Sequence, residues 1–269
     1  MDYTLNCNGR LLSLETPQVM GILNATPDSF FADSRQQTEE GIARRTHQIL
    51  DEGGSIIDVG ACSTRPDSQP VSEDEEMERL RFALPIVRRE APHAIISVDT
   101  FRPVVARMAV EEYGADIIND VGNHTSQFSV LSSPFDMFRM VSRLRVPYIY
   151  MSHKSTVKEV MLDCAEAVAA LRSMGQKDII LDPGFGFGKT LEENYALMQQ
   201  LERMQTLQLP LLVGISRKSM IWKLLQTTPD GALNGTTVLN TIALMKGADI
   251  LRVHDVRQAA ECVKLTSNP

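Results

Sequence analysis

Long apolar runs and regularly spaced cysteines are both missing from this chain of 269 residues. No apolar segment reaches the roughly 20 residues that a membrane-spanning helix needs, and the first residues lack the profile of a signal peptide. The four cysteines, Cys7, Cys62, Cys164 and Cys262, lie far apart and form no C-x-x-C pair. Because this spacing indicates neither a disulfide framework nor a zinc site, we expect a cytoplasmic protein without a membrane partner.

An excess of positive charge is missing as well. The chain has 27 lysines and arginines against 34 acidic residues, which gives a net charge of -7 and a sequence pI near 5.3. Nucleic acids and anionic membranes attract basic proteins over long distances. They are therefore not expected as main partners, although local basic pockets are compatible with this balance.

What the sequence contains is a recurring pattern, a short apolar run followed by a longer segment with helical periodicity. Three of the helical segments begin with a capping box, in which Ser72, Thr156 or Thr190 is followed three residues later by glutamate. The eight apolar runs lie at residues 19–24, 55–59, 94–99, 117–120, 148–151, 179–182, 211–214 and 250–253. Such strands alternating with helices predict a parallel sheet covered by helices.

The number of runs favours a closed (β/α)8 barrel, the TIM barrel, over an open doubly wound sheet. Nearly every run also ends on polar or ionisable residues, and in a barrel all these ends lie on one face. The dipeptide Asn8-Gly9 between short alternating segments predicts a tight hairpin before the first run. We therefore predict one α/β domain, with the hairpin in residues 1–16 and the barrel in residues 17–269.

A glycine-rich stretch at residues 182–190 follows the sixth run and ends in Gly188-Lys189-Thr190, as a phosphate-binding loop does. Pro183 stands where that loop needs a glycine, and the glycines do not have the spacing of a dinucleotide fingerprint. The stretch therefore predicts a strand-end carboxylate, Asp182, beside a tight turn, and not a nucleotide phosphate site.

Three strand ends carry Asp99, Asn119 and Asp182, two carboxylates and an amide. Together they can hold a planar heterocycle with N–H donors, since carboxylates accept such bonds with charge-assisted strength. Metal binding or capping of the following helices is the alternative for each residue taken alone. Asp58 and Asp120 are interpreted as structural.

Cations gather at other strand ends. Arg65, Lys218, Arg252 and His254 could together hold a diphosphate. The pair of cations that includes Lys218 stands at a predicted helix start, where it opposes the helix dipole by roughly 0.3–1 kcal/mol, and this favours a functional reason. Asn24 could ligate Mg²⁺ or hold a phosphate oxygen, with ordinary turn chemistry as the alternative.

Seven short motifs between residues 19 and 256 resemble, in type and in order, those of the dihydropteroate synthase family. They are Asn24-Ala25-Thr26-Pro27-Asp28-Ser29-Phe30, Ser63-Thr64-Arg65-Pro66, Val98-Asp99-Thr100, Ile118-Asn119-Asp120-Val121, Asp182-Pro183-Gly184-Phe185-Gly186-Phe187-Gly188-Lys189, Ser216-Arg217-Lys218-Ser219 and Arg252-Val253-His254-Asp255-Val256. The resemblance implies a transferase that joins 6-hydroxymethyl-7,8-dihydropterin diphosphate to 4-aminobenzoate and releases pyrophosphate in folate biosynthesis.

The resemblance also implies a role for each site residue. The pterin ring would contact Asp99, Asn119, Met151, Asp182 and Lys218. The diphosphate would contact Asn24, Arg65, Arg252 and His254, with Mg²⁺ bound at Asn24. The 4-aminobenzoate would contact Thr64, Phe187 and Ser219, where sulfonamides bind in the family. The residues expected to carry catalysis are Asn24, Asp99, Asp182, Lys218 and Arg252, in a protein that forms a homodimer.

Two loops, at residues 25–37 and 62–72, are expected to close over the reaction, and both depart from the family pattern. Asp33 is the counterpart of a loop aspartate, and Cys62 stands where the family usually has glutamate. Two alternatives stay open. A methyltetrahydrofolate:corrinoid methyltransferase would share the ring contacts without needing a diphosphate site, and a non-catalytic relative would bind the pterin without turnover.

Overall fold

Eight parallel strands form a ring in the computed structural model, which describes residues 3–25, 35–62, 71–122 and 134–267. Neighbouring strands follow the order β8-β7-β6-β5-β4-β3-β10-β9. The ring closes where Leu181 bridges Leu211 in parallel and the Leu181 N–H donates to the carbonyl of Pro210 at 2.8 Å. Strands that are adjacent in the chain are thus adjacent in space, and the predicted single (β/α)8 barrel is confirmed.

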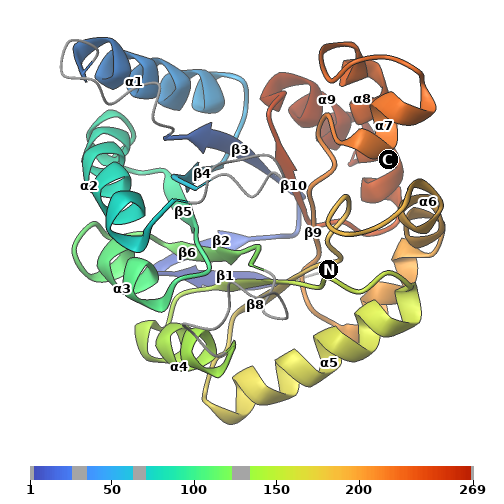
Figure 1. The fold of residues 1–269 in the computed structure, drawn as a ribbon, viewed down its shortest axis with the longest axis horizontal. Helices are drawn as coiled ribbons and strands as arrows, with labels where there is room; N and C mark the ends of the chain where they lie inside the picture. The colour runs from blue at the N-terminus through green and yellow to red at the C-terminus, as the bar shows by residue number, and fades with distance from the viewer. Residues whose placement is uncertain (1–2, 26–34, 63–70, 123–133, 268–269) are drawn as a thin grey trace.

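The predicted apolar runs coincide with the barrel strands to within about two residues at each end. The strands are β3 (Gln18–Asn24), β4 (Ile56–Gly60), β5 (Ile95–Asp99), β6 (Ile117–Asp120), β7 (Tyr148–Met151), β8 (Ile179–Asp182), β9 (Leu212–Val213) and β10 (Ile250–Val253). The helices around them are α1 (Arg35–Asp51), α2 (Glu73–Glu90), α3 (Pro103–Glu111), α4 (Pro134–Leu144), α5 (Val157–Ser173), α6 (Leu191–Gln199), α7 (Ser219–Leu224), α8 (Leu233–Met245) and α9 (Val256–Thr266). Figure 1 shows these helices surrounding the strands. None of the helices in the described ranges is both long and apolar enough to cross a bilayer.

The predicted N-terminal hairpin closes the amino end of the barrel. Its strands β1 (Thr4–Cys7) and β2 (Arg10–Ser13) pair antiparallel, and both turn residues between them, Asn8 and Gly9, have positive φ. It packs on an apolar layer to which every barrel strand contributes one inward-facing residue. The layer consists of Met20, Ile56, Ile95, Ile117, Ile149, Ile180, Leu212 and Ile250, covered by Leu5, Cys7 and Leu14. The amino end of the barrel is therefore filled by packed apolar side chains.

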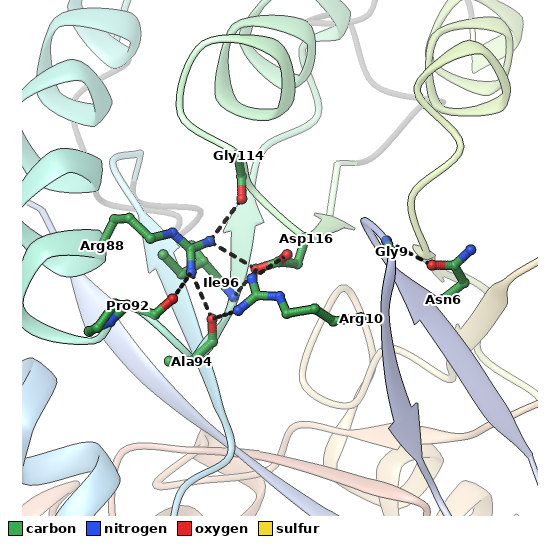
Figure 2. A network of polar contacts seen from close by, with 9 residues as sticks. All are labelled: Asn6, Gly9, Arg10, Arg88, Pro92, Ala94, Ile96, Gly114 and Asp116. Atoms are coloured by element: carbon green, nitrogen blue, oxygen red, sulfur yellow. Dashed lines mark hydrogen bonds and ion pairs between the residues drawn. The ribbon is translucent and has the colours of Figure 1, made fainter.

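An ion network around one buried carboxylate fastens the hairpin to the barrel, as Figure 2 shows. Arg10 of β2 donates to both oxygens of Asp116 at 2.6 Å, and Arg88 of α2 donates to the same carboxylate at 3.0 Å. The backbone N–H of Ile96 supplies a further donor at 2.8 Å. Both arginines also donate to the carbonyl of Ala94. The carboxylate and its cations thus satisfy one another at the end of the barrel opposite to the strand carboxyl ends.

Two of the three predicted capping boxes are confirmed. Thr156 and Thr190 each accept from the N–H three residues on, and the glutamate at that position bonds back to the cap. Ser72 accepts from the Glu75 N–H at 3.2 Å, but the Glu75 carboxylate pairs with Arg79. The third box is therefore only half formed, because an arginine one turn along the helix competes for its carboxylate.

Candidate active site

The next inward-facing positions toward the carboxyl ends of several strands carry polar side chains in place of apolar ones. On β4, Ile56 is followed two residues later by Asp58, and on β5, Ile95 is followed by Ser97 and Asp99. Alternate residues of a strand face the same side, so these polar groups point into the barrel near the carboxyl ends of its strands. The candidate site therefore lies on the face opposite to the hairpin.

Arg252 of β10 crosses this face between two carboxylates. Its Nε donates to Asp58 Oδ2 at 2.7 Å, and its Nη2 donates to Asp99 Oδ2 at 2.6 Å. Burial lowers the pKa of Arg252, but the two carboxylates outweigh this effect and raise the pKa above its usual value. The guanidinium therefore stays charged and is fixed across the base of the site.

The Asp99 carboxyl is poised between its two protonation states. Burial raises its pKa to about 7, an effect that Arg252 opposes and that Asp58 reinforces. Such a carboxyl is divided between its protonated and ionised forms near neutral pH. Asp99 can therefore accept a hydrogen bond from a ligand or, when protonated, donate one.

Asn119 lies beside Asp99 in the sheet register and is fully buried. Its Nδ2 donates to Asp58 Oδ2 at 3.1 Å. Its Oδ1 is buried and has no hydrogen-bond partner in the part of the chain that the structure describes. A buried acceptor without a partner is costly, and a ligand N–H group would satisfy it.

Asp182 and Lys218 form the second half of the site. Asp182 Oδ1 accepts from the Gly184 N–H at 2.7 Å, and burial raises the pKa of Asp182 against the attraction of Lys218. Burial lowers the pKa of the Lys218 ammonium to about 7, against the attraction of Asp182. The Nζ donates to the carbonyl of Phe185 and lies 4.3 Å from the ring centroid of Phe187. Both groups thus hold an incompletely compensated charge.

The glycine turn after Asp182 makes room for Lys218. Gly186 has a φ of +80°, and a Cβ there would lie 2.8 Å from Lys218 Cδ. The Gly186 N–H donates to Asn194 Oδ1 at 2.7 Å, which ties the turn to α6. The prediction that this stretch forms a tight turn beside a carboxylate is therefore confirmed.

Lys189 fastens the same turn to the end of β7. Its Nζ donates to the carbonyl of Gly184 at 2.8 Å and, at longer distances, to those of Ser152 (3.4 Å) and Phe187 (3.5 Å). Burial lowers the pKa of Lys189, while Asp182 opposes this effect. The lysine that resembles that of a phosphate loop thus has its donors engaged by backbone carbonyls.

The remaining predicted residues range from the buried Met151 to side chains exposed at the ends of other strands and helices. Met151 ends β7 and is paired in register with Asp182, whereas Asn24 ends β3 with an exposed side chain. The half-buried His254 follows β10, and its carbonyl accepts from Arg45 of α1 at 2.7 Å. The half-buried Ser219 is the first residue of α7, and Phe187, also half-buried, meets the ring of His153 edge to face. Thr64, Arg65 and Asp33 lie outside the described residues.

Sequence reasoning grouped Arg252 with the diphosphate residues, yet its contacts are with Asp58 and Asp99. Its assignment to the diphosphate stays a prediction. Asp58 was interpreted as structural, but it lies at the centre of the site network. The alternation of side chains along a strand could have identified Asp58. Asp58 lies two residues after the inward-facing Ile56, just as Ser97 lies two residues after the inward-facing Ile95.

The donor set for the expected Mg²⁺ is small. Within the described ranges, no group of three or more His, Cys, Asp or Glu residues is arranged to hold a metal ion. Mg²⁺ keeps several waters and usually takes only one or two protein ligands beside substrate phosphates. The exposed amide of Asn24 at a strand end fits that pattern, as one ligand of an ion carried mainly by a diphosphate.

Comparisons with known proteins identify the family of the chain. The family model described as pterin binding enzyme matches residues 20–254. The chain is 36% identical to dihydropteroate synthases of Clostridium beijerinckii (94% of each chain covered) and Escherichia coli (97% of this chain and 94% of that one). A solved Xanthomonas albilineans dihydropteroate synthase with 4-aminobenzoic acid is 34% identical, with a TM-score of 0.86 over 99% of this chain and 98% of that one. One from Coxiella burnetii in complex with pteroic acid is 31% identical, with a TM-score of 0.84 over the same shares. The chain therefore belongs to the pterin-binding enzymes and, among them, to the dihydropteroate synthase family.

Proposed function

We propose that this site condenses 6-hydroxymethyl-7,8-dihydropterin diphosphate with 4-aminobenzoate to give 7,8-dihydropteroate and pyrophosphate. The observation that carries the proposal is the acceptor set of Asp99, Asn119 Oδ1 and Asp182 beside the cations Arg252 and Lys218. A pterin presents several ring and amino N–H donors along one edge, together with a ring carbonyl. Acceptors and cations at the carboxyl end of a barrel complement both kinds of group.

The pterin is proposed to lie on the base of the site. Asp182 and the Asn119 oxygen, which has no partner among the described residues, would accept its N–H groups, and Met151 would contact the ring. Lys218 would donate to the ring carbonyl in place of the Phe185 carbonyl that now accepts from it. Because these groups are already fixed by the barrel, little reorganisation would accompany binding.

The reaction breaks the bond between the pterin methylene carbon and the diphosphate oxygen. The electron pair leaves with pyrophosphate, and the resulting positive charge spreads into the pterin ring, near Asp99 and Asp182. The nitrogen of 4-aminobenzoate then bonds to the methylene carbon and loses a proton. Electrostatic stabilisation of the separating charges by fixed groups is the main contribution that we assign to the protein.

The leaving diphosphate is proposed to meet Arg65, Arg252 and His254. Asn24 would hold Mg²⁺, which supplies further positive charge to the phosphate oxygens when bound. The 4-aminobenzoate would lie between Phe187, Ser219 and Thr64, so we expect sulfonamides to compete with it.

The test uses the purified protein with both substrates and Mg²⁺. We expect equimolar dihydropteroate and pyrophosphate, and no pyrophosphate burst beyond one turnover when 4-aminobenzoate is omitted. Pterin binding without product would identify the non-catalytic alternative. The methyltransferase alternative is not supported, since the relatives at 36% identity are dihydropteroate synthases.

We also propose that two copies associate through the face formed by α7, α8 and α9, which adjoin in Figure 1. These helices and the C-cap of α7 carry exposed large apolar side chains, namely Leu224, Leu225, Val238, Met245 and Leu265. Exposed apolar side chains on neighbouring helices are a feature expected of a surface that contacts another protein. Light scattering should then give twice the 29.9 kDa of one chain, and the monomer mass would contradict the proposal.

A further inference from the structure

A single carboxylate, Asp58, joins three strands of the barrel at the base of the site. It is fully buried and accepts from Ser97 Oγ of β5 at 2.6 Å, Asn119 Nδ2 of β6 at 3.1 Å and Arg252 Nε of β10 at 2.7 Å. The Ser97 bond uses Oδ1, whereas the other two bonds share Oδ2. Asp58 is therefore bonded to two residues that are proposed to contact the substrate.

The contact with Asp58 fixes which end of the Asn119 amide faces the ligand. An ionised carboxylate can only accept hydrogen bonds, so the amide must present its NH₂ group to Asp58. Its oxygen then points the other way and lacks a partner among the described residues. With the amide reversed, a donor would stand where the ring N–H groups of a pterin are proposed to bind.

The same carboxylate also fixes Arg252. The guanidinium donates to Asp58 through Nε and to Asp99 through Nη2, so each of the two carboxylates accepts from one of its nitrogens. Without Asp58, the guanidinium would be free to turn wholly toward Asp99 and cover one of the ring acceptors. Asp58 thus keeps both the amide and the cation in the orientation that leaves the acceptors open.

We propose that Asp58 is a positioning residue that selects a ligand edge rich in N–H donors, by orienting the Asn119 amide and holding Arg252 without touching the substrate. The inference rests on the proposed function, because it assigns the pterin edge to these acceptors. It assigns Asp58 a role in recognition that sequence reasoning did not give it.

The first test compares two substitutions of Asp58. Asp58→Leu removes the acceptor, so the Asn119 amide and Arg252 lose their common anchor. We expect the KM for the pterin diphosphate to rise by about 10-fold to 100-fold, with the KM for 4-aminobenzoate nearly unchanged. Asp58→Asn should restore most of the affinity, because its oxygen can accept from both residues while its NH₂ donates to Ser97.

Ser97→Ala is the matched control. It removes a buried hydrogen bond to the same carboxylate but leaves both contacts of Oδ2 intact. We expect less than about a 3-fold change in the KM for the pterin diphosphate, since neither the amide nor the guanidinium loses its partner. An equal loss in Ser97→Ala and Asp58→Leu would reduce Asp58 to a structural residue and overturn the proposal.

The pH profile of Asp58→Asn gives a second readout, because this substitution removes the charge of the side chain while nearly keeping its shape. Asp99 faces Arg252, Asp58, Glu76, Asp120 and Lys218. Removing the negative charge of Asp58 takes away one influence that raises the pKa of Asp99, so that pKa should fall. The acid limb of kcat/KM for the pterin diphosphate should therefore move to lower pH. An unmoved limb would contradict the electrostatic contact of Asp58 with the site, even if Asp58→Leu fails to fold.

The outcomes separate this inference from the proposed function. If the parent protein neither binds the pterin diphosphate nor forms dihydropteroate, the proposed function is wrong. If the parent is active and Asp58→Leu keeps the parental KM, or if Asp58→Asn fails to restore it, the role of Asp58 is wrong while the function stands.

Discussion

Arginines gather around buried aspartates at both ends of the barrel, but donors and acceptors balance at only one of the two clusters. At the amino end, Asp116 accepts from Arg10, Arg88 and a backbone N–H (Figure 2). At the carboxyl end, Arg252 is shared by two carboxylates, and Asn119 Oδ1 has no partner in the described part of the chain. A closed set of contacts serves stability, whereas an open set leaves polar groups for a ligand.

The charges follow the same division. At the carboxyl end, burial raises the pKa of Asp99 to about 7 and lowers that of Lys218 to about 7. Strongly shifted groups that face one another in a barrel mouth are typical of active sites. The same residue types therefore fasten the fold at the amino end and hold incompletely compensated charge at the carboxyl end.

The largest expected effect comes from breaking the hydrogen-bonded ion network at the amino end of the barrel. Asp116→Ala removes a buried carboxylate that accepts from Arg10, Arg88 and the Ile96 N–H, so we expect the free energy of unfolding to fall by about 3 kcal/mol. Urea unfolding measures this loss. Turnover per folded molecule should stay at the parental value, because the hydrogen bonds of this network go to Ala94, Ile96, Gly114 and their neighbours at the amino end of the barrel. A matching fall in pterin affinity would show that the two ends are coupled.

The second largest effect is expected at the carboxyl end of the barrel, where polar groups are left for a ligand. Asp182→Asn turns one charge-assisted acceptor partly into a donor, and pterin binding should weaken by roughly 1–3 kcal/mol. The variant oxygen can still accept from the Gly184 N–H, so the fold should lose far less stability than in Asp116→Ala. Calorimetric titration with the pterin substrate measures the affinity. Parental affinity would remove Asp182 from the site.

A pH-dependent difference in stability should distinguish Asp99 from an ordinary aspartate. The folded pKa of Asp99 is raised to about 7, above the roughly 3.9 of an unfolded chain. Its contribution to stability is therefore present below pH 4 and is lost as the pH rises to 7. We expect the unfolding free energy of the parent, relative to Asp99→Asn, to fall across this window and then to level off.

Urea unfolding at several pH values measures the Asp99 difference. Asp51→Asn, at an exposed side chain that ends α1, is the matched control. The difference for Asp99→Asn should change with pH far more than the difference for this exposed control. A constant difference for Asp99→Asn as well would show that Asp99 is ionised throughout this range.

The sequence was sufficient to predict the barrel because its information is local. Each apolar run is bounded by polar strand ends, and parallel strands bring those ends to one face, which placed Asp99, Asn119 and Asp182 together. The two confirmed capping boxes depend on residues only three positions apart. Local patterns of this kind survive folding unless a nearby side chain competes, as Arg79 does for Glu75.

The partners within the site could not be predicted in this way. Asp58 and Arg252 are 194 residues apart, so a buried mid-strand aspartate could be interpreted only as structural. Arg252 was expected among the diphosphate residues, but it donates to Asp99, which is 153 residues away in the chain. Such contacts depend on how the barrel closes, and no local motif records them.

The smallest expected effect concerns Lys189, which links the glycine turn to β7 without lying among the acceptors. Lys189→Met keeps the length of the side chain but removes the donor to the Gly184 carbonyl, and the Gly184 N–H holds Asp182. We expect pterin affinity to fall by roughly 1 kcal/mol, about fivefold. Calorimetric titration with the pterin substrate measures this change.

Thr190→Ala is the control for Lys189, because the neighbouring threonine caps α6. It should lower the free energy of unfolding by about 1 kcal/mol while leaving pterin affinity unchanged. If Lys189→Met instead weakened the binding of pyrophosphate and spared that of the pterin, the lysine would act on the phosphate after all. Lys189 would then be a ligand-binding residue and not one that stabilises the fold, because its ammonium would have to leave the backbone carbonyls that now accept from it.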